Sequence, residues 1–421
     1  MRTLIFGAGA SIPFFTPTLD TAYLTDKVCS KVEWDRVHES YIHYNGKNQK
    51  LLNNEIVIRI INEIKHIQPK ANFEQIAEVI DKISSWGFDK IPKNNMLNLL
   101  VYILNTGFQP MNPLPFGIEW QDVPFLFRQI IAEAILDLQD NHKSKEFTRL
   151  IEQQRDFISN VCEIDDEVSI ISLNYDDCVL DSLVDLGFEK GFRPTNLNYG
   201  MQMDVPTFLN ARRVVYFPHG HIRFMFTDND NVSYFTNSTT ANRWRWENLD
   251  GVMVGSTATV LPGKFAYNYN TFLTTGQTKD EGLNHLPYSV YYQRMAVDLY
   301  KSNTIYIIGY SFGDDHINRL LRSFIKMGNR NRIVIVDFVP DMIDMTQTAE
   351  SGNSIIHKIH YYLSTEWILT YKEGIGLMAD NPQDIDNINE RGFGQLFPQV
   401  YFYKWGYESF LDQFHDITNL I

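Results

Sequence analysis

Residues 1–15 read MRTLIFGAGASIPFF, and within them a short apolar run, TLIF (3–6), leads directly into the glycine turn GAGAS (7–11). A buried strand followed at once by closely spaced glycines is typical of the phosphate-binding turn of nucleotide-binding α/β folds. The full dinucleotide fingerprint needs a third glycine or alanine at position 12, where this chain has Ile12 followed by Pro13. The glycines could equally serve an ordinary tight turn that needs backbone freedom. The stretch therefore predicts an α/β fold and leaves two interpretations of its glycines open.

Four more compact runs of β-branched and aromatic residues follow: VSIISL (168–173), RVVYF (213–217), TIYIIG (304–309) and RIVIVD (332–337). They lack the alternation of a half-exposed strand, which favours central strands of a parallel sheet that is covered on both faces. The first, second and fourth of the five runs end in GAGAS, NYDD and GYSFGDD, and RVVYF ends in PHGH. Ligands of open α/β sheets bind outside the carboxyl ends of the strands, so we expect these four turns to converge on one crevice.

The rest of the chain is expected to surround this sheet. The sheet core should comprise about 1–19 and 165–340, with a large helical insertion over about 20–165, where apolar residues recur at three- and four-residue spacings. A polar segment, about 223–285, reads as an irregular insertion. Residues 341–421 are expected to be helical and aromatic-rich, and to supply core or oligomer contacts.

Composition narrows the class of protein. The 421 residues carry a net charge of −14, which argues against a broad nucleic-acid surface. There is no apolar run of 18 residues and no credible signal peptide, so we expect no membrane span and a cytoplasmic location. Cys29, Cys162 and Cys178 form no CxxC pair, which excludes a four-cysteine zinc site and suits a reducing compartment. We therefore expect no metal.

The turn SLNYDD (172–177) delivers Asn174 and Asp176 to the end of a buried strand. One interpretation is an Asx turn that caps the following helix, because Asp and Asn are good N-caps. The functional alternative is that Asn174 orients a water or a ribose hydroxyl while Asp176 contacts the sugar or a positive charge.

The stretch FPHGHI (217–222) supplies the candidate general base. His219 follows a strand and lies between Pro218 and Gly220. Pro218 restricts the backbone before it, and Gly220 allows the backbone after it an unusual conformation. Its unperturbed pKa lies near the operating pH, as a general base requires. His221 is the rival candidate. A zinc site made from both histidines is disfavoured, because they are two residues apart and no third ligand follows.

The stretch IYIIGYSFGDDHINRLL (305–321) reads as strand, glycine turn and helix. Gly309 permits a close backbone approach, and Ser311 can donate a hydrogen bond to a phosphate or ribose. The string GYSFG also fits the G-x-S-x-G nucleophile elbow of α/β-hydrolases, although that interpretation leaves GAGAS and PHGH unexplained. Asp337, at the end of RIVIVD, is placed where acidic residues of nucleotide-binding folds meet ribose hydroxyls or adenine.

Taken in order, GAGAS with IP, SLNYD, PHG and GYSF resemble four turns of the sirtuin family. The resemblance covers about 1–17, 168–222 and 304–340. It implies an α/β fold with a Rossmann-like parallel sheet of the sirtuin type, NAD as the bound molecule, and roles for particular residues. Those implied to be catalytic are Asn174, Asp176 and His219; those implied to line NAD are Gly7, Ala8, Gly9, Ser11, Pro13, Gly220, Gly309, Ser311 and Asp337.

The chain departs from protein deacylases of this family in two ways: it has no CxxC pairs for a zinc ribbon, and it carries the long helical insertion. This pattern resembles the sirtuin-like NAD-consuming effectors of bacterial anti-phage defence, and a stand-alone chain of this size resembles the partner of a HerA-like ATPase. The resemblance implies an NAD glycohydrolase that consumes NAD as substrate and works as a homo-oligomer. The alternatives are an ADP-ribosyltransferase or deacylase, and a non-catalytic module that senses NAD or ADP-ribose.

Overall fold

The structure is a computed structural model of the 421-residue chain. It describes residues 1–16, 21–32, 43–44, 47–48, 61–62, 64–66, 68–77, 79, 123–194, 201–227, 231–236, 286–326, 332–340, 358–359, 362–363, 382–397 and 399–420.

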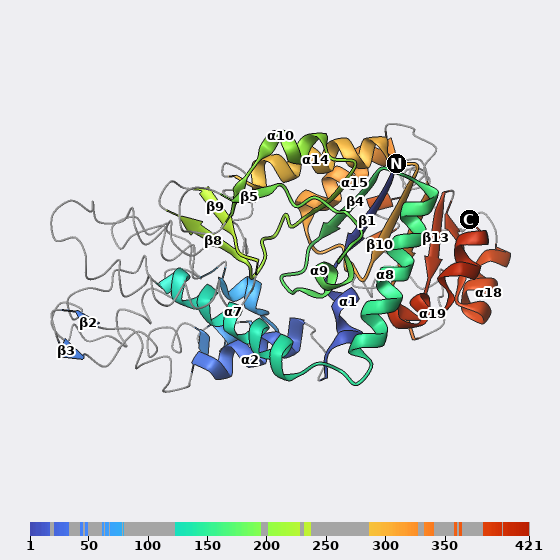
Figure 1. The fold of residues 1–421 in the computed structure, drawn as a ribbon. Coiled ribbons are helices and arrows are strands. Elements are labelled where there is room, and N and C mark those ends of the chain that lie inside the picture. The colour runs from blue at the N-terminus through green and yellow to red at the C-terminus, as the bar shows by residue number, and fades with distance from the viewer. Residues whose placement is uncertain are drawn as a thin grey trace.

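A seven-stranded sheet with the order β12-β13-β11-β10-β1-β4-β7 forms the centre of the protein (Figure 1). The first strand of the chain, β1, lies inside the sheet next to the central strand β10, and it pairs in parallel with both β4 and β10. All neighbours from β13 to β7 are parallel, and only the edge strand β12 is antiparallel. The strands are β1 (Arg2–Phe6), β4 (Val168–Ser172), β7 (Arg213–Tyr216), β10 (Thr304–Ile308), β11 (Arg332–Val336), β12 (Phe393–Phe397) and β13 (Val400–Tyr403).

The five strands predicted from sequence are thus all present, and the expected α/β fold with a Rossmann-like parallel sheet is confirmed. Every residue of β4 and of β10 is buried, which agrees with the continuous apolar runs of a sheet that is covered on both faces. Helices cover the sheet: α8 (Phe147–Ile164), α14 (Tyr288–Lys301), α15 (Asp315–Lys326) and α19 (Gly406–Leu420).

The two faces of the sheet meet different helices. On one face Phe157 of α8 lies edge-on to Tyr306 of β10, with ring centroids 5.5 Å apart, and to Phe410 and Phe414 of α19 at 5.2 and 5.6 Å. On the other face Ser169 of β4 donates to the buried carboxylate of Asp298 in α14 at 2.6 Å. Side chains alternate between faces along a strand, so one sheet supports both layers.

The region beyond residue 340 contributes strands as well as helices, which the sequence analysis did not expect. β13 extends the parallel sheet next to β11, and α18 (Pro382–Arg391) precedes β12. Tyr407 of α19 reaches the core, where its ring lies 6.0 Å from that of Phe6. The aromatic residues 401–414 therefore belong largely to the core of the chain itself, while the expected oligomer contacts stay a prediction.

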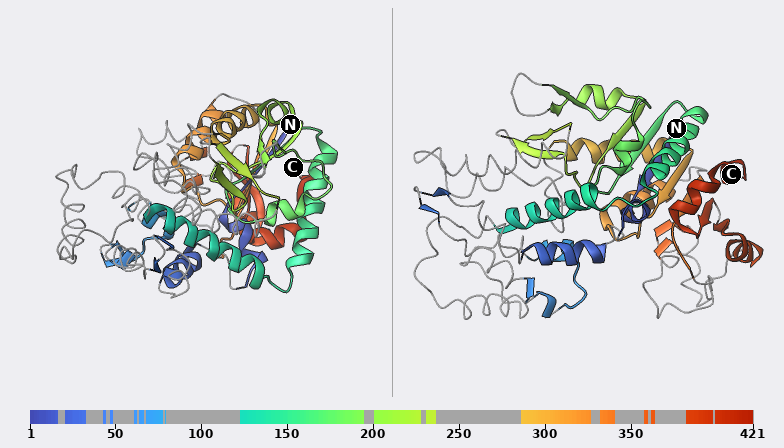
Figure 2. Two further views of the ribbon diagram at one scale, coloured as in Figure 1. Left: turned by 60° about the vertical axis from the view of Figure 1, so that its left-hand side comes forward. Right: turned by 60° about the horizontal axis from the view of Figure 1, so that its bottom comes forward.

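The described part of the helical insertion contains α2 (Thr21–Val32) and α7 (Val123–Asn141), which pack side by side (Figures 1 and 2). A short hairpin, β2 (His43–Tyr44) with β3 (Lys47–Asn48), lies farther out. Within the predicted helical insertion, residues 49–60 and 80–122 lie outside the described residues.

A second, four-stranded antiparallel sheet of order β5-β6-β9-β8 lies beside the main one. Its strands are β5 (Phe192–Pro194), β6 (Met201–Met203), β8 (Phe224–Thr227) and β9 (Asn231–Tyr234), and the helices α9 (Cys178–Ser182) and α10 (Val205–Asn210) adjoin it in the sequence. The segment expected to be irregular from 223 therefore starts as a hairpin, in which β8 pairs with β9. Across these strands Phe192 stacks on Tyr234, and Phe224 lies tilted against Phe192 and edge-on to Tyr234. Residues 237–285 of that segment lie outside the described residues.

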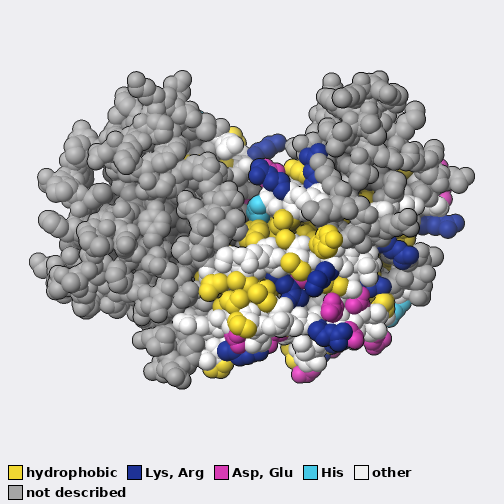
Figure 3. Space-filling model, turned by 90° about the horizontal axis from the view of Figure 1, so that it is seen from above, with side chains coloured by type: hydrophobic (Ala, Val, Ile, Leu, Met, Phe, Trp, Pro, Cys, Tyr) yellow, Lys and Arg dark blue, Asp and Glu magenta, His cyan; other side chains and the backbone are white. Residues whose placement is uncertain are grey.

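On the face shown in Figure 3, Lys and Arg side chains are interspersed with acidic and apolar ones. Leu209 of α10, with Val297 and Tyr300 of α14, is among the exposed large apolar residues. Within the described ranges, no helix combines the length and the apolar character that crossing a membrane requires.

The glycine turn after β1 packs directly on the glycine turn after β10. A Cβ on Gly7 would lie 2.6 Å from the carbonyl oxygen of Gly309, and one on Gly309 would lie 2.1 Å from the nitrogen of Ala10. The N–H of Gly9 donates to the Gly309 carbonyl at 2.8 Å. Gly309 also has a φ of +60°, a conformation that other residues adopt at a cost. These glycines are required by contact between two backbones.

We predict that Gly309→Ala lowers the free energy of unfolding more than Gly187→Ala does. Gly187 has a similar φ of +73°, but a Cβ there would meet no atom within 4 Å, so its substitution carries only the backbone cost of about 1 kcal/mol. Gly309→Ala adds a clash worth roughly 1–3 kcal/mol more. Urea unfolding of both variants measures the difference, and equal losses would contradict the packing argument.

Candidate functional site

The turns that follow β1, β4, β7 and β10 contact one another at the carboxyl edge of the sheet. The β1 turn meets the β4 turn through Asn174 and the β10 turn through Gly309. The β7 turn meets the β4 turn through the N–H of Ile222, which donates to the carbonyl of Tyr175 at 3.1 Å. The expected convergence of four turns is confirmed, because the carboxyl ends of parallel strands share one edge.

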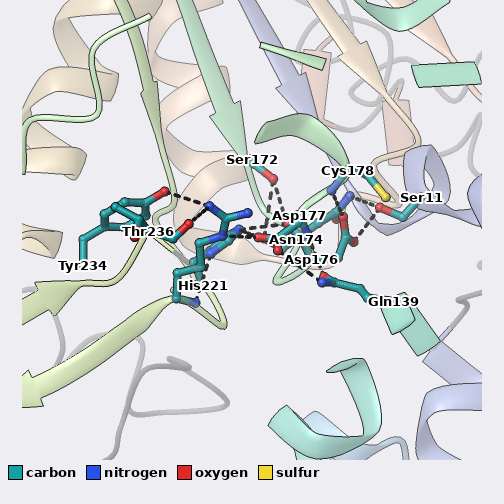
Figure 4. A network of polar contacts seen from close by, with 11 residues as sticks. Ser11, Gln139, Ser172, Asn174, Asp176, Asp177, Cys178, His221, Tyr234 and Thr236 are labelled. Carbon is teal, nitrogen blue, oxygen red and sulfur yellow. Dashed lines mark hydrogen bonds and ion pairs between the residues drawn. The ribbon is translucent and has the colours of Figure 1, made fainter. Parts of the chain in front are cut away.

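Asn174 ties the β4 turn to the β1 turn (Figure 4). Its side-chain amide donates to the carbonyl of Gly7 at 2.9 Å and to Oγ of Ser11 at 2.8 Å. The side chain is 5% exposed. Among the described residues its amide oxygen has no hydrogen-bond partner. The amide nitrogen therefore holds the two turns together, and the amide oxygen can accept a hydrogen bond from a ligand.

Asp176, two residues after Asn174, also joins the β4 turn to the β1 turn. Its Oδ2 accepts from Oγ of Ser11 at 2.7 Å, and its Oδ1 accepts from the N–H of Cys178 at 3.0 Å. The second bond is an Asx turn, so the capping interpretation of SLNYDD is correct for Asp176. Burial raises the pKa of Asp176, and the hydrogen bonds from Ser11 and Cys178 offset part of that rise. This carboxylate is a positioning group.

His221 is fully buried and uses both of its ring nitrogens. Nδ1 accepts from the N–H of Arg223 at 3.2 Å, and Nε2 lies 2.9 Å from the carbonyl oxygen of Asp176. Nε2 must therefore carry the proton. Burial lowers the pKa of His221 to about 4, even though Asp177 at 3.5 Å works against the shift. A neutral ring held at both nitrogens is a poor general base, so the geometry argues against His221 as the rival to His219.

Asp177 and Arg223 form a nearly buried ion pair under His221, with Nε of Arg223 2.7 Å from Oδ1 of Asp177. Burial works to raise the pKa of Asp177, but its interactions with His221, with the charge of Arg223 and with the hydrogen-bond donors of Arg223 and Gln139 outweigh it, and the pKa is lowered. Arg223 also donates to the carbonyl of Thr236 at 2.6 Å, next to β9. The pair thereby fixes the second sheet to the β4 turn.

The helical insertion reaches this edge at two points. Gln139 of α7 donates to Oδ2 of Asp177 at 3.2 Å and accepts from the N–H of the same residue at 2.8 Å. Glu74 accepts from the hydroxyl of Tyr175 at 2.9 Å. The insertion is therefore held against the residues of the β4 turn.

His219 is 2% exposed and faces the start of α15. Its Nε2 lies 3.2 Å from Nε2 of His316 and 3.8 Å from Oδ1 of Asp314. Gly220, whose φ is +93°, turns the chain after it, and its N–H donates to the carbonyl of Phe217 at 3.0 Å. The structure thus brings His219 to the same edge as Asn174, on the neighbouring turn.

The remaining predicted residues lie along this edge. Ala8 is exposed, and its N–H has no hydrogen-bond partner among the described residues, whereas those of Gly7 and Gly9 are taken by Ile308 and Gly309. Pro13 lies in the short helix Ile12–Phe14, directly after α1 (Ala8–Ser11).

Ser311 and Asp337 follow β10 and β11 at the same edge. Ser311 is exposed, and within the described part of the chain its hydroxyl contacts no histidine, which disfavours the α/β-hydrolase interpretation of GYSFG. Burial raises the pKa of Asp337 to about 6, and its Oδ1 accepts from the N–H of Phe338.

Sequence reasoning missed the partners of these residues. Gln139, Arg223, Asp314 and His316 all contact a predicted residue or its neighbour, at separations of 38 to 97 positions in the chain. The string GDDH after a glycine turn was the one local signal for Asp314 and His316. Gln139 and Arg223 had none, because only the tertiary structure brings them to Asp177.

The fold and the site thus define an α/β protein with polar turns at the carboxyl edge of a parallel sheet. Residues 168–356 match the sequence model of the family described as SIR2-like domain. The matched stretch begins with β4 and runs past β11, so it includes Asn174, His219 and the β10 turn, while β1 and GAGAS precede it. This part of the chain is therefore sirtuin-like, which indicates a function related to NAD. No curated protein matches the chain.

We predict that His221 makes the protein less stable as the pH falls from about 6.5 to about 4. Its pKa is lower in the folded chain than in the unfolded chain, so the unfolded chain binds more protons across this window. Its contribution is present above pH 6.5 and should fall by up to about 3 kcal/mol by pH 4.

Chemical unfolding at pH 7.5, 6, 5 and 4.5 measures this effect as the difference in slope between the wild type and His221→Gln. Asp337, whose pKa burial raises to about 6, titrates in the same range, but it does so in both proteins and cancels. The exposed His415 provides the control, and His415→Gln should keep the wild-type slope. Identical slopes for wild type and His221→Gln would contradict the assignment.

Proposed function

We propose that the protein is an NAD glycohydrolase, which cleaves NAD to nicotinamide and ADP-ribose. One observation carries the proposal: Asn174, whose amide oxygen remains for a ligand, and His219 lie on adjacent turns at the carboxyl edge of a sheet whose sequence is sirtuin-like. A binding module has no need of a general base. This favours an enzyme over the sensor alternative.

The proposed reaction breaks the bond between C1′ of the nicotinamide ribose and the ring nitrogen of nicotinamide. Nicotinamide leaves as a neutral base with the bonding electrons, so no strong general acid is needed. A water oxygen forms the new bond to C1′, and its proton goes to His219. The amide oxygen of Asn174 would orient the water or a ribose hydroxyl, a task of positioning that lowers the barrier.

The residues along the edge fit a dinucleotide. Ala8 offers an N–H for a phosphate, Ser311 an exposed hydroxyl, and Asp337 a carboxylate at the end of β11. Gly7, Gly9 and Gly309 would shape the edge and not bind through their amides, since each of those N–H groups already has a backbone partner. Ser11 would act through Asn174 and Asp176, to which its hydroxyl is committed.

The biological part of the proposal rests on the resemblance in sequence. We propose an NAD-depleting effector of anti-phage defence that works as a homo-oligomer with a HerA-like ATPase. Constant NAD hydrolysis would harm the host cell, so turnover should depend on assembly or on the partner. Full activity of an isolated monomer would contradict this dependence.

We predict that His219→Ala lowers the rate of NAD hydrolysis by ~10²–10⁴-fold, the usual contribution of a general base. Asn174→Ala should also lower the rate strongly, because water and ribose lose an orienting group. Nicotinamide and ADP-ribose are followed by chromatography, with and without the candidate partner. Calorimetry with ADP-ribose shows whether binding is retained, and His415→Ala is the control histidine variant.

The outcomes separate the alternatives. Full activity in His219→Ala would remove His219 from the role of base. Binding of NAD without turnover, alone and with the partner, would favour the sensor. Transfer of ADP-ribose or deacylation of a lysine peptide at a higher rate than hydrolysis would favour the other enzyme classes.

A further inference from the structure

His219, Asp314 and His316 form a three-residue cluster that the proposed hydrolysis uses only in part. Each offers one ligand atom, and these atoms all lie within 4.8 Å of one another. The two Nε2 atoms are 3.2 Å apart, and Oδ1 of Asp314 is 3.8 Å from Nε2 of His219. Two separate elements therefore converge on one point: the turn after β7 and the start of α15.

The spacing of the two histidine nitrogens, 3.2 Å, is that of two ligands around one metal ion. Bonds of 2.0–2.1 Å to a tetrahedral zinc ion place two ligand nitrogens about 3.3 Å apart. A cation bound between the two rings would take the lone pair of each Nε2, and the carboxylate of Asp314, 3.8 Å from His219, would neutralise part of its charge.

The backbone around the cluster is held in place, as a metal site requires. Asp314 is fixed by Tyr310, whose hydroxyl accepts from the N–H of Asp314 and donates to its carbonyl, both at 3.2 Å. The single proton of this hydroxyl can instead be donated to Oδ1 of Asn318, which lies 3.0 Å away. On the other side, the hydrogen bond from Gly220 to Phe217 closes the turn that carries His219.

We propose that His219, Asp314 and His316 bind a divalent transition-metal ion of the zinc class. Two imidazoles and one carboxylate are ligands that Zn²⁺ accepts, whereas Mg²⁺ and Ca²⁺ prefer oxygen ligands alone. Water or a further group would fill the fourth position of a tetrahedral ion.

The site has a regulatory consequence that rests on the proposed function. A metal on Nε2 of His219 occupies the lone pair that would take the proton from water. Metal binding therefore inhibits NAD hydrolysis, and a chelator restores it. Binding itself does not depend on the proposed function, so the two can fail separately.

The test is metal binding by the full-length protein in the absence of NAD. The protein is stripped with EDTA, dialysed, and titrated with Zn²⁺ alone by calorimetry, and with Co²⁺ alone by visible absorption, which reports tetrahedral coordination. We expect one equivalent bound by the wild type and by His415→Gln. His219→Gln, Asp314→Asn and His316→Gln should each weaken binding by more than about 100-fold, since loss of a ligand costs at least as much as loss of an outer-shell partner.

Circular dichroism of each variant establishes that it is folded, and His316→Gln, on a partly exposed helix position, guards against a folding defect in His219→Gln. Absence of Zn²⁺ binding by the wild type, or equal binding by the three ligand variants, would overturn the metal site whatever the protein does to NAD. One bound equivalent without NAD hydrolysis, in EDTA or in Zn²⁺ and with the candidate partner present, would overturn the proposed function and leave the metal site in place. Hydrolysis that is as fast with Zn²⁺ bound as without it would overturn the inhibition.

Discussion

The close contact between the backbones of two glycine turns is the constraint on which this structure depends. β1 lies inside the sheet between β10 and β4, and the turn that leaves it passes within hydrogen-bonding distance of Gly309. The absence of side chains at Gly7, Gly9 and Gly309 makes this possible. Once the two turns are in contact, the turn after β4 can bind the other side of the β1 turn through Asn174. The carboxyl edge of the sheet is therefore assembled around the first eleven residues.

The rest of this edge is held together by buried polar groups, each of which has hydrogen-bond or charge partners. Asp177 is paired with Arg223 and supported by Gln139, so a charge that would be costly in isolation has partners. His221 lies above the pair as a neutral ring with both nitrogens satisfied. One set joins the main sheet, the second sheet and the helical insertion. The two histidines of this turn therefore have different roles. His221 stabilises the structure, and His219 faces a second histidine and a carboxylate.

The sequence alone determined the parallel sheet and the residues at its edge. Continuous apolar runs predict strands buried on both faces, and a parallel strand must end at the edge where its neighbours end, so Asn174 and His219 could be placed together without coordinates. Prediction failed where local pattern is weak: β12, β13 and the strands of the second sheet are short, and the aromatic residues 401–414 gave no signal that distinguished a core strand from an oligomer contact.

Only the tertiary structure decided what the individual atoms at the edge do. From sequence, the glycines of GAGAS read as space for a phosphate, yet another backbone fills that space. The sequence favoured His219 and kept His221 as a rival; their environments differ because Arg223 and Asp176 engage the ring of His221 and His316 that of His219. Hydrophobic periodicity and turn-forming residues are local properties, which can be read directly from a sequence. The long-range partners at this edge, such as Gln139 for Asp177 and Gly7 for Asn174, lie 38 and 167 residues away in the chain, and only folding brings them there.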